Sequence, residues 1–105
     1  RMLRQLGVND VILDPGFGFA KTLEQNYELM RSFAEFSLHF DTPLLVGISR
    51  KSMIYKLLNT TPENSLNGTT VLNTYALLNG ADILRVHDVK AAAEAIEIVK
   101  QLMPS

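Results

Sequence analysis

Three short apolar runs, each followed by a longer stretch with helical spacing, constrain the fold of this chain more than any other feature. The runs cover residues 11–13, 44–48 and 83–86 and are rich in Val, Ile and Leu. A βαβαβα order of this kind indicates parallel strands with right-handed crossovers, because each helix must return the chain to the same end of the sheet. The sequence therefore predicts an α/β fold with a parallel sheet.

Local signals place helices after these strands. The first helix is expected to begin at Thr22, where Gln25 completes a capping box, and to bury Leu23, Tyr27, Met30 and Ala34. We expect a short helix over 51–58, a polar loop over 60–68 and a longer helix over 69–79. Asp88 is expected to cap the last helix, whose apolar stripe comprises Ala92, Ala95, Ile96, Val99 and Leu102.

Length and charge limit the functional classes. The 105 residues predict one domain, and 1–6 followed by Gly7 has the pattern of a helix end, so the chain is expected to begin inside an element. A net charge of -1 and a pI near 6.1 give no basic field for nucleic acid or an anionic membrane. The absence of cysteine and of any apolar run near the roughly 20 residues of a membrane span favours a cytoplasmic protein.

Three polar motifs follow the three predicted strands. They are DPGFGFAK over 14–21, GISRKS over 47–52 and RVHD over 85–88. Because the carboxyl ends of parallel strands lie at one edge of a sheet or barrel, the motifs are expected to converge on one pocket.

The first motif offers a carboxylate at a strand end. Asp14 can accept two parallel hydrogen bonds from a planar, amidine-like ligand edge, or it can merely satisfy backbone amides in the turn. Phe17 and Phe19 either join the core or stack on a flat ligand. The motif is no dinucleotide fingerprint, since GxGxxG is not completed.

The other two motifs carry cations. Arg50, Lys51 and Ser52 fall at a predicted helix start and can clamp a carboxylate or phosphate, although for this motif taken alone a solvated basic turn is the more common role. Arg85 and His87 lie on the same side of an extended segment and can hold a phosphate group. The alternative is a salt bridge for Arg85 and an ordinary polar strand end for His87.

Taken in this order, DPGFGFAK, VGISRKSMI and RVHDV resemble the three C-terminal signatures of dihydropteroate synthases. Each motif alone is weak, but the ordered set is highly specific, and the likeness runs from about residue 7 to 99. It implies a partial TIM (β/α)8 barrel made of the sixth to eighth βα units, so that 1–105 would be an incomplete pterin-binding domain. The departure is Ala20, where many members have glycine.

The resemblance implies an enzyme that displaces pyrophosphate from 6-hydroxymethyl-7,8-dihydropterin pyrophosphate with p-aminobenzoate, using Mg²⁺, to give 7,8-dihydropteroate. It implies catalytic roles for Asp14 and Lys51, and a pterin site formed by Asp14, Phe19, Gly47 and Lys51. It also implies a p-aminobenzoate site formed by Phe19, Arg50, Lys51 and Ser52, and a pyrophosphate site formed by Arg85 and His87.

The family also uses parts that this chain lacks, among them the main Mg²⁺ ligand and two mobile early loops. We therefore expect the 105-residue chain alone to be inactive. We also expect it to associate with itself, because three βα units without the rest of a barrel leave unpaired strand edges and exposed apolar strand faces. The resemblance implies a homodimer, since family members commonly pair through late-barrel helices.

Two other functions fit parts of the pattern. A pterin-dependent methyltransferase shares the barrel and a pterin-facing carboxylate, but methyl transfer has no diphosphate for SRKS and RVHD to hold. A non-enzymatic half-barrel that assembles with a partner has no physical need for this set of cations.

Overall fold

The structure, a computed structural model, describes residues 16, 21–39 and 43–103. Two parallel strands, β1 (Leu45–Val46) and β2 (Ile83–Leu84), confirm the predicted α/β class with parallel strands. The predicted strand over 11–13 lies outside the described residues. The helices are α2 (Leu23–Arg31), α3 (Phe33–Leu38), α4 (Ser52–Tyr55), the 3-10 helix η1 (Pro62–Asn64), α5 (Leu66–Leu78) and α6 (Val89–Leu102).

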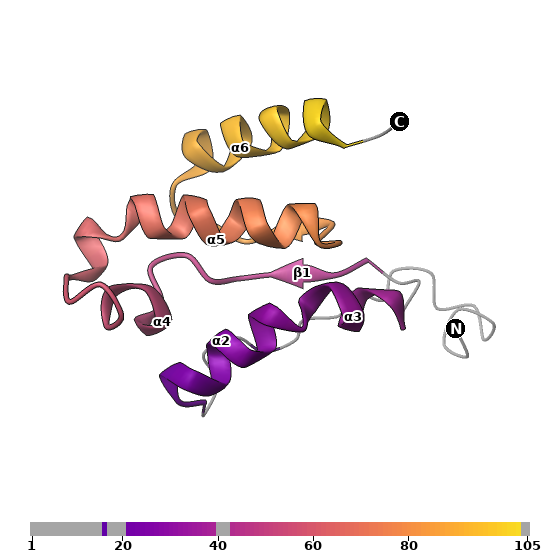
Figure 1. Cartoon of the computed structure of the whole chain (residues 1–105). Coiled ribbons are helices and arrows are strands. Elements are labelled where there is room, and N and C mark those ends of the chain that lie inside the picture. Colours follow the sequence, from indigo (N-terminus) through magenta and orange to yellow (C-terminus); the bar gives the residue numbers. More distant parts are fainter. Residues whose placement is uncertain (1–15, 17–20, 40–42, 104–105) are drawn as a thin grey trace, which may run out of the picture.

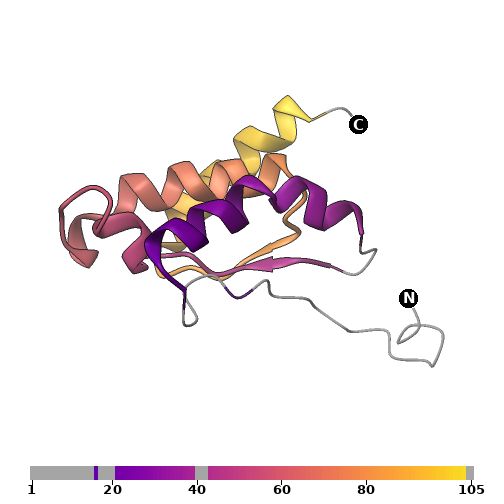
Figure 2. The ribbon, with the colours of Figure 1, turned by 60° about the horizontal axis from the view of Figure 1, so that its bottom comes forward.

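In the view of Figure 1, β1 runs between α5 and the α2–α3 segment. The turned view in Figure 2 shows the two strands in one layer, with α2, α3 and α5 on the same side of it. The ladder is regular over its short length, with the N–H groups of Ile83 and Arg85 donating to the carbonyls of Leu44 and Val46 at 3.1 and 2.9 Å. The last helix, α6, packs against α5. None of the helices in the described part of the chain is long and apolar enough to cross a membrane.

Helix α2 begins at the predicted capping box. The Thr22 hydroxyl accepts a hydrogen bond from the Gln25 N–H at 3.1 Å, and the Gln25 side chain accepts from the Thr22 N–H at 2.9 Å. These two contacts satisfy amides that the first helical turn leaves without partners. The start of this helix was therefore predictable from four residues of sequence.

The buried face of this helical segment differs from the prediction. Met30 is buried as expected, but Leu23 is exposed, and the buried positions are Asn26, Met30 and Phe33. Asn26 can be buried because its amide donates to the Thr22 carbonyl at 3.1 Å. The prediction was right for Met30 and wrong for Leu23, and it missed Asn26 because it considered apolar residues alone.

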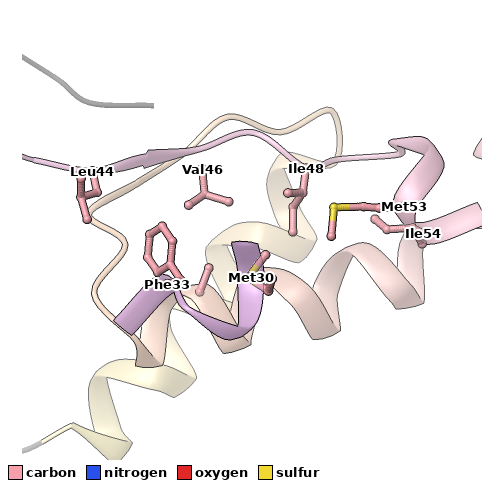
Figure 3. Packing of buried hydrophobic residues seen from close by; sticks show 8 residues of the cluster. Met30, Phe33, Leu44, Val46, Ile48, Met53 and Ile54 are labelled. Carbon is pink, nitrogen blue, oxygen red and sulfur yellow. The ribbon is translucent and has the colours of Figure 1, made fainter. Parts of the chain in front are cut away.

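The core lies between the strands and the helices that cover them. Leu44, Val46 and Ile48 point from the β1 segment toward Met30 and Phe33 (Figure 3). Alternate residues of a strand face opposite sides, so the intervening Gly47 and Ser49 must face away from these helices. The apolar packing thereby decides which side chains are presented on the other face of the sheet.

The predicted loop over 60–68 is too long, because α5 already begins at Leu66 and contains Gly68. A Cβ on Gly68 would lie 2.5 Å from the Ile54 Cγ2, so glycine is needed for α4 to pack closely on α5. In α6, Ala92, Ala95 and Val99 are buried as predicted, whereas Leu102 is exposed. Helix periodicity predicts which face of α6 is buried, but not how far along α6 the neighbouring helix extends.

We predict that Ile48→Val lowers the free energy of unfolding by about 0.5 to 1.5 kcal/mol, because it removes one buried methylene group. Ile48 is fully buried, whereas Ile98 on α6 is 62% exposed. The matched substitution Ile98→Val should change stability by less than about 0.5 kcal/mol. Urea unfolding of the two variants measures the difference, and equal losses would contradict the assignment of the core.

Candidate functional site at the strand ends

The register of the two strands places the second and third motifs next to each other. In the sheet Leu45 pairs with Ile83 and Val46 with Leu84. The same separation of 38 residues recurs in the hydrogen bonds between Ser49 and His87 and between Arg50 and Asp88. The motifs at 47–52 and 85–88 therefore lie side by side at the carboxyl ends of β1 and β2.

A cavity of about 130 Å³ opens between these two strand ends. We call it the strand-end cavity, and it is lined by Gly47, Ser49, Lys51, Arg85, Val86 and His87. Four predicted site residues, Gly47, Lys51, Arg85 and His87, are thus brought together. Arg50 and Ser52 are not among the lining residues.

Gly47 makes room for a guanidinium group. A Cβ at this position would lie 2.8 Å from Nη2 and 3.0 Å from Nε of Arg85. Because such a contact is shorter than van der Waals distance, any larger residue would displace Arg85. The sequence prediction gave Gly47 a role toward a flat ligand, and the described structure adds its role toward Arg85.

His87 is anchored to Ser49 by two contacts. The His87 N–H donates to the Ser49 Oγ at 3.2 Å, and the ring nitrogen Nδ1 lies 3.3 Å from the same oxygen. Ser49 is buried, while the His87 side chain is exposed at the cavity. Ser49 therefore holds the ring of His87 by its Nδ1 edge, and the rest of the ring is exposed at the cavity.

Arg50 forms a two-point ion pair with Asp88. Its Nη2 and Nε donate to the two carboxylate oxygens at 2.8 and 3.3 Å. The hydrogen bond from Arg50 lowers the pKa of Asp88, and the same bond raises the pKa of Arg50. Asp88 is the N-cap residue of α6, as predicted, but its carboxylate binds Arg50 and makes no capping hydrogen bond to the helix.

Lys51 and Ser52 mark the start of α4, as predicted. Lys51 is the N-cap residue and lines the strand-end cavity, while Ser52 is the first residue of the helix. Since α4 has only four residues, its dipole is small, and any attraction for an anion here depends mainly on the Lys51 ammonium group. The p-aminobenzoate roles of Arg50 and Ser52 stay predictions.

The first motif is described only in part. Asp14 and Phe19 lie outside the described residues. Gly16 has a φ of +82°, in the left-handed region, and its carbonyl accepts from the Lys21 ammonium at 2.9 Å. Lys21 thus forms a hydrogen bond to the backbone of its own motif.

No group of three or more His, Asp and Glu side chains within the described residues could hold a metal ion. The described residues therefore provide no such cluster for Mg²⁺.

Sequence reasoning missed three features of the site. These are Ser49, the pairing of Asp88 with Arg50, and Thr69, whose hydroxyl accepts from the Arg50 N–H at 3.2 Å. For Ser49 a signal existed, since it alternates with Val46 and Ile48 in the same way as Gly47. For Thr69 none existed, because its contact depends on how α5 packs beside the turn.

Comparisons with known proteins identify the family of the chain. The family described as "Pterin binding enzyme" matches residues 1–87. Dihydropteroate synthase of Escherichia coli K12 is 52% identical over 90 residues, which cover 86% of this chain and 32% of the relative. The chain thus spans about a third of the length of this curated relative.

Solved structures extend the likeness to the fold. Yersinia pestis dihydropteroate synthase superposes with a TM-score of 0.87 at 45% identity, covering 96% of this chain and 48% of that chain. The Coxiella burnetii synthase, solved in complex with pteroic acid, gives a TM-score of 0.84 at 40% identity, covering 94% and 38%. These neighbours are TIM barrels, and the α/β chain corresponds to part of such a barrel.

We predict that Asp88→Asn lowers the free energy of unfolding at pH 7, because it removes the negative charge that pairs with Arg50. A carboxyl group whose pKa is lower in the folded state than in the unfolded state contributes its full stabilisation at any pH above the unfolded-state pKa, here 3.8. This stabilisation is lost as the pH falls through the folded-state pKa. The gap between wild type and Asp88→Asn should therefore close in acid.

Urea unfolding at pH 7 and in acid measures this gap. Glu97→Gln is the matched control, since Glu97 and Lys100 form an exposed pair 3.5 Å apart that should contribute little. A pH-independent gap for Asp88→Asn, or an equal loss in the control at pH 7, would contradict the prediction.

Proposed function

Because this chain belongs to the pterin binding enzyme family, we propose that it supplies the sixth to eighth βα units of a dihydropteroate synthase. The complete enzyme would join 6-hydroxymethyl-7,8-dihydropterin pyrophosphate to p-aminobenzoate and release pyrophosphate. One observation carries this proposal: Lys51, Arg85 and His87 line a single cavity at the carboxyl ends of two parallel strands. The relatives named dihydropteroate synthase support it.

The strand-end cavity has the chemistry that a departing diphosphate needs. Arg85 has a planar fork of donors, Lys51 a compact ammonium charge, and His87 a ring N–H. Groups positioned before the reaction stabilise negative charge as it develops on the leaving group. In this proposal Arg85 and His87 hold the diphosphate, and Lys51 contacts the pterin and the incoming amine.

The remaining roles follow from the family resemblance. Asp14 would bind the amino-pyrimidine edge of the pterin and stabilise positive charge on its ring, and Gly47 would allow close approach. Phe19, Arg50 and Ser52 would form the p-aminobenzoate site with Lys51. For Arg50 this requires one of its donors to reach the ligand while others remain on Asp88, and a guanidinium has five N–H donors in total.

The metal ion, the partners and the location follow from the family resemblance. Mg²⁺ would be required, with its main protein ligand outside this chain. The partners would be small-molecule substrates and, for the complete protein, a second copy. A cytoplasmic location fits an enzyme of this type and a chain without cysteine.

In the full-length synthase, Arg85→Ala should weaken inhibition by inorganic pyrophosphate by about 10- to 100-fold, the loss expected from one charge-assisted contact. Arg31→Ala is the matched control, because Arg31 lies in the last turn of α2 and does not line the cavity. A continuous assay of pyrophosphate release, with each substrate omitted in turn, tests the activity itself. Unchanged pyrophosphate inhibition in Arg85→Ala would refute the diphosphate role.

The 105-residue chain alone should show no turnover, because it spans about a third of its relatives. It should also associate with itself. Val71, Leu78, Ile98 and Leu102 on α5 and α6 are exposed, and burying apolar surface returns about 25 cal/mol per Å².

Sedimentation velocity at tens of micromolar tests this association. Ile98→Lys should shift the chain toward monomer, whereas Leu38→Lys, on the exposed side of α3, should not. A wild-type monomer, or pyrophosphate release by the isolated chain, would contradict the respective expectation.

A further inference from the structure

Ser49 stands where the backbone ladder between the strands ends. The carbonyl of Ile48, which would continue the ladder, accepts instead from the Lys51 N–H at 3.1 Å, because the chain turns there. The His87 N–H, which would have paired with that carbonyl, donates instead to the Ser49 Oγ at 3.2 Å. A side-chain oxygen thus replaces a backbone acceptor at the edge of the strand-end cavity.

The same oxygen lies 3.3 Å from the Nδ1 of His87. A backbone N–H can only donate, so Oγ is the acceptor in the first contact. In the second contact two arrangements are possible: the hydroxyl donates to a bare Nδ1, or it accepts from an Nδ1–H group. The position of the hydroxyl proton distinguishes them.

The surroundings of Ser49 favour donation to Nδ1. If Oγ accepted from both nitrogens, its own proton would have to point to another acceptor. Within the described part of the chain, both contacts found for this hydroxyl are with His87. Ser49 is only 7% exposed, and a buried hydroxyl proton without a partner costs free energy.

We propose that Ser49 is a positioning residue that holds the neutral imidazole of His87 as the Nε2–H tautomer. The hydroxyl accepts from the backbone N–H and donates to Nδ1, so the ring proton resides on Nε2. A neutral His87 then keeps one donor for an anion in the strand-end cavity. The use of that donor on a diphosphate rests on the proposed function, but the tautomer does not.

Nitrogen NMR tests the tautomer directly. The chain has two histidines, and His39 at the end of α3 is exposed and serves as an internal reference. In ¹⁵N-histidine-labelled protein at about pH 9, where imidazoles are normally neutral, the Nδ1 of His87 should resonate as an unprotonated nitrogen and its Nε2 as a protonated one. His39 should show the averaged shifts of a ring exchanging between tautomers.

Substitutions separate positioning from simple packing. Ser49→Ala should move the His87 shifts toward those of His39, and Ser49→Thr, which keeps the hydroxyl, should restore them. An Nδ1–H tautomer in the wild type would overturn the proposal, as would unchanged His87 shifts in a folded Ser49→Ala protein. If Ser49→Ala does not fold, the wild-type spectrum still decides between the two arrangements.

Pyrophosphate binding to the full-length synthase distinguishes this proposal from the proposed function. Ser49→Ala should weaken binding of inorganic pyrophosphate by about 2- to 10-fold, the effect of one ordinary hydrogen bond. If the NMR shifts change as expected but pyrophosphate binding does not, the diphosphate role of His87 is wrong and the tautomer assignment stands.

Discussion

Backbone pairing of Leu45 with Ile83 and of Val46 with Leu84 fixes the contacts downstream along both strands. In a parallel pair the register cannot change without a bulge, so a separation set in the sheet continues to the strand ends. Here the separation of 38 residues sets Ser49 beside His87 and Arg50 beside Asp88. A slip by one residue would turn Arg85 toward the helices and break each of these pairs.

Hydrophobic burial maintains that register. Val46 and Ile48 are fully buried against the helices, which leaves Gly47 and Ser49 on the opposite face. The core therefore determines the orientation of the site, although the side chains of the core and of the cavity lie on opposite sides of the strands. In the TIM-barrel relatives that opposite face belongs to the barrel interior.

Much of the fold could be predicted because its signals are local. The two described strands, the capping box at Thr22 and the start of α4 depend on a few adjacent residues each. The placement of Lys51, Arg85 and His87 at one cavity followed from a topological rule about parallel strands. By contrast, the role of Gly68 against Ile54 and the ion pair of Arg50 with Asp88 depend on packing between distant segments. A sequence pattern does not encode such distances directly. For that reason Asp88 was placed correctly at the start of α6, but the pairing of its side chain with Arg50 was missed.

The backbone of Arg50 shows why that partner matters. Its φ of +56° lies in the left-handed region, which Asn59 also adopts at +54°. Asparagine tolerates this conformation, whereas an arginine there needs compensating contacts. Arg50 has them: its N–H donates to Thr69 of α5 and its guanidinium binds Asp88 at the start of α6. The turn that presents Lys51 is thus held by two helices that follow it in the chain, so residues outside the strand-end cavity determine the geometry within it.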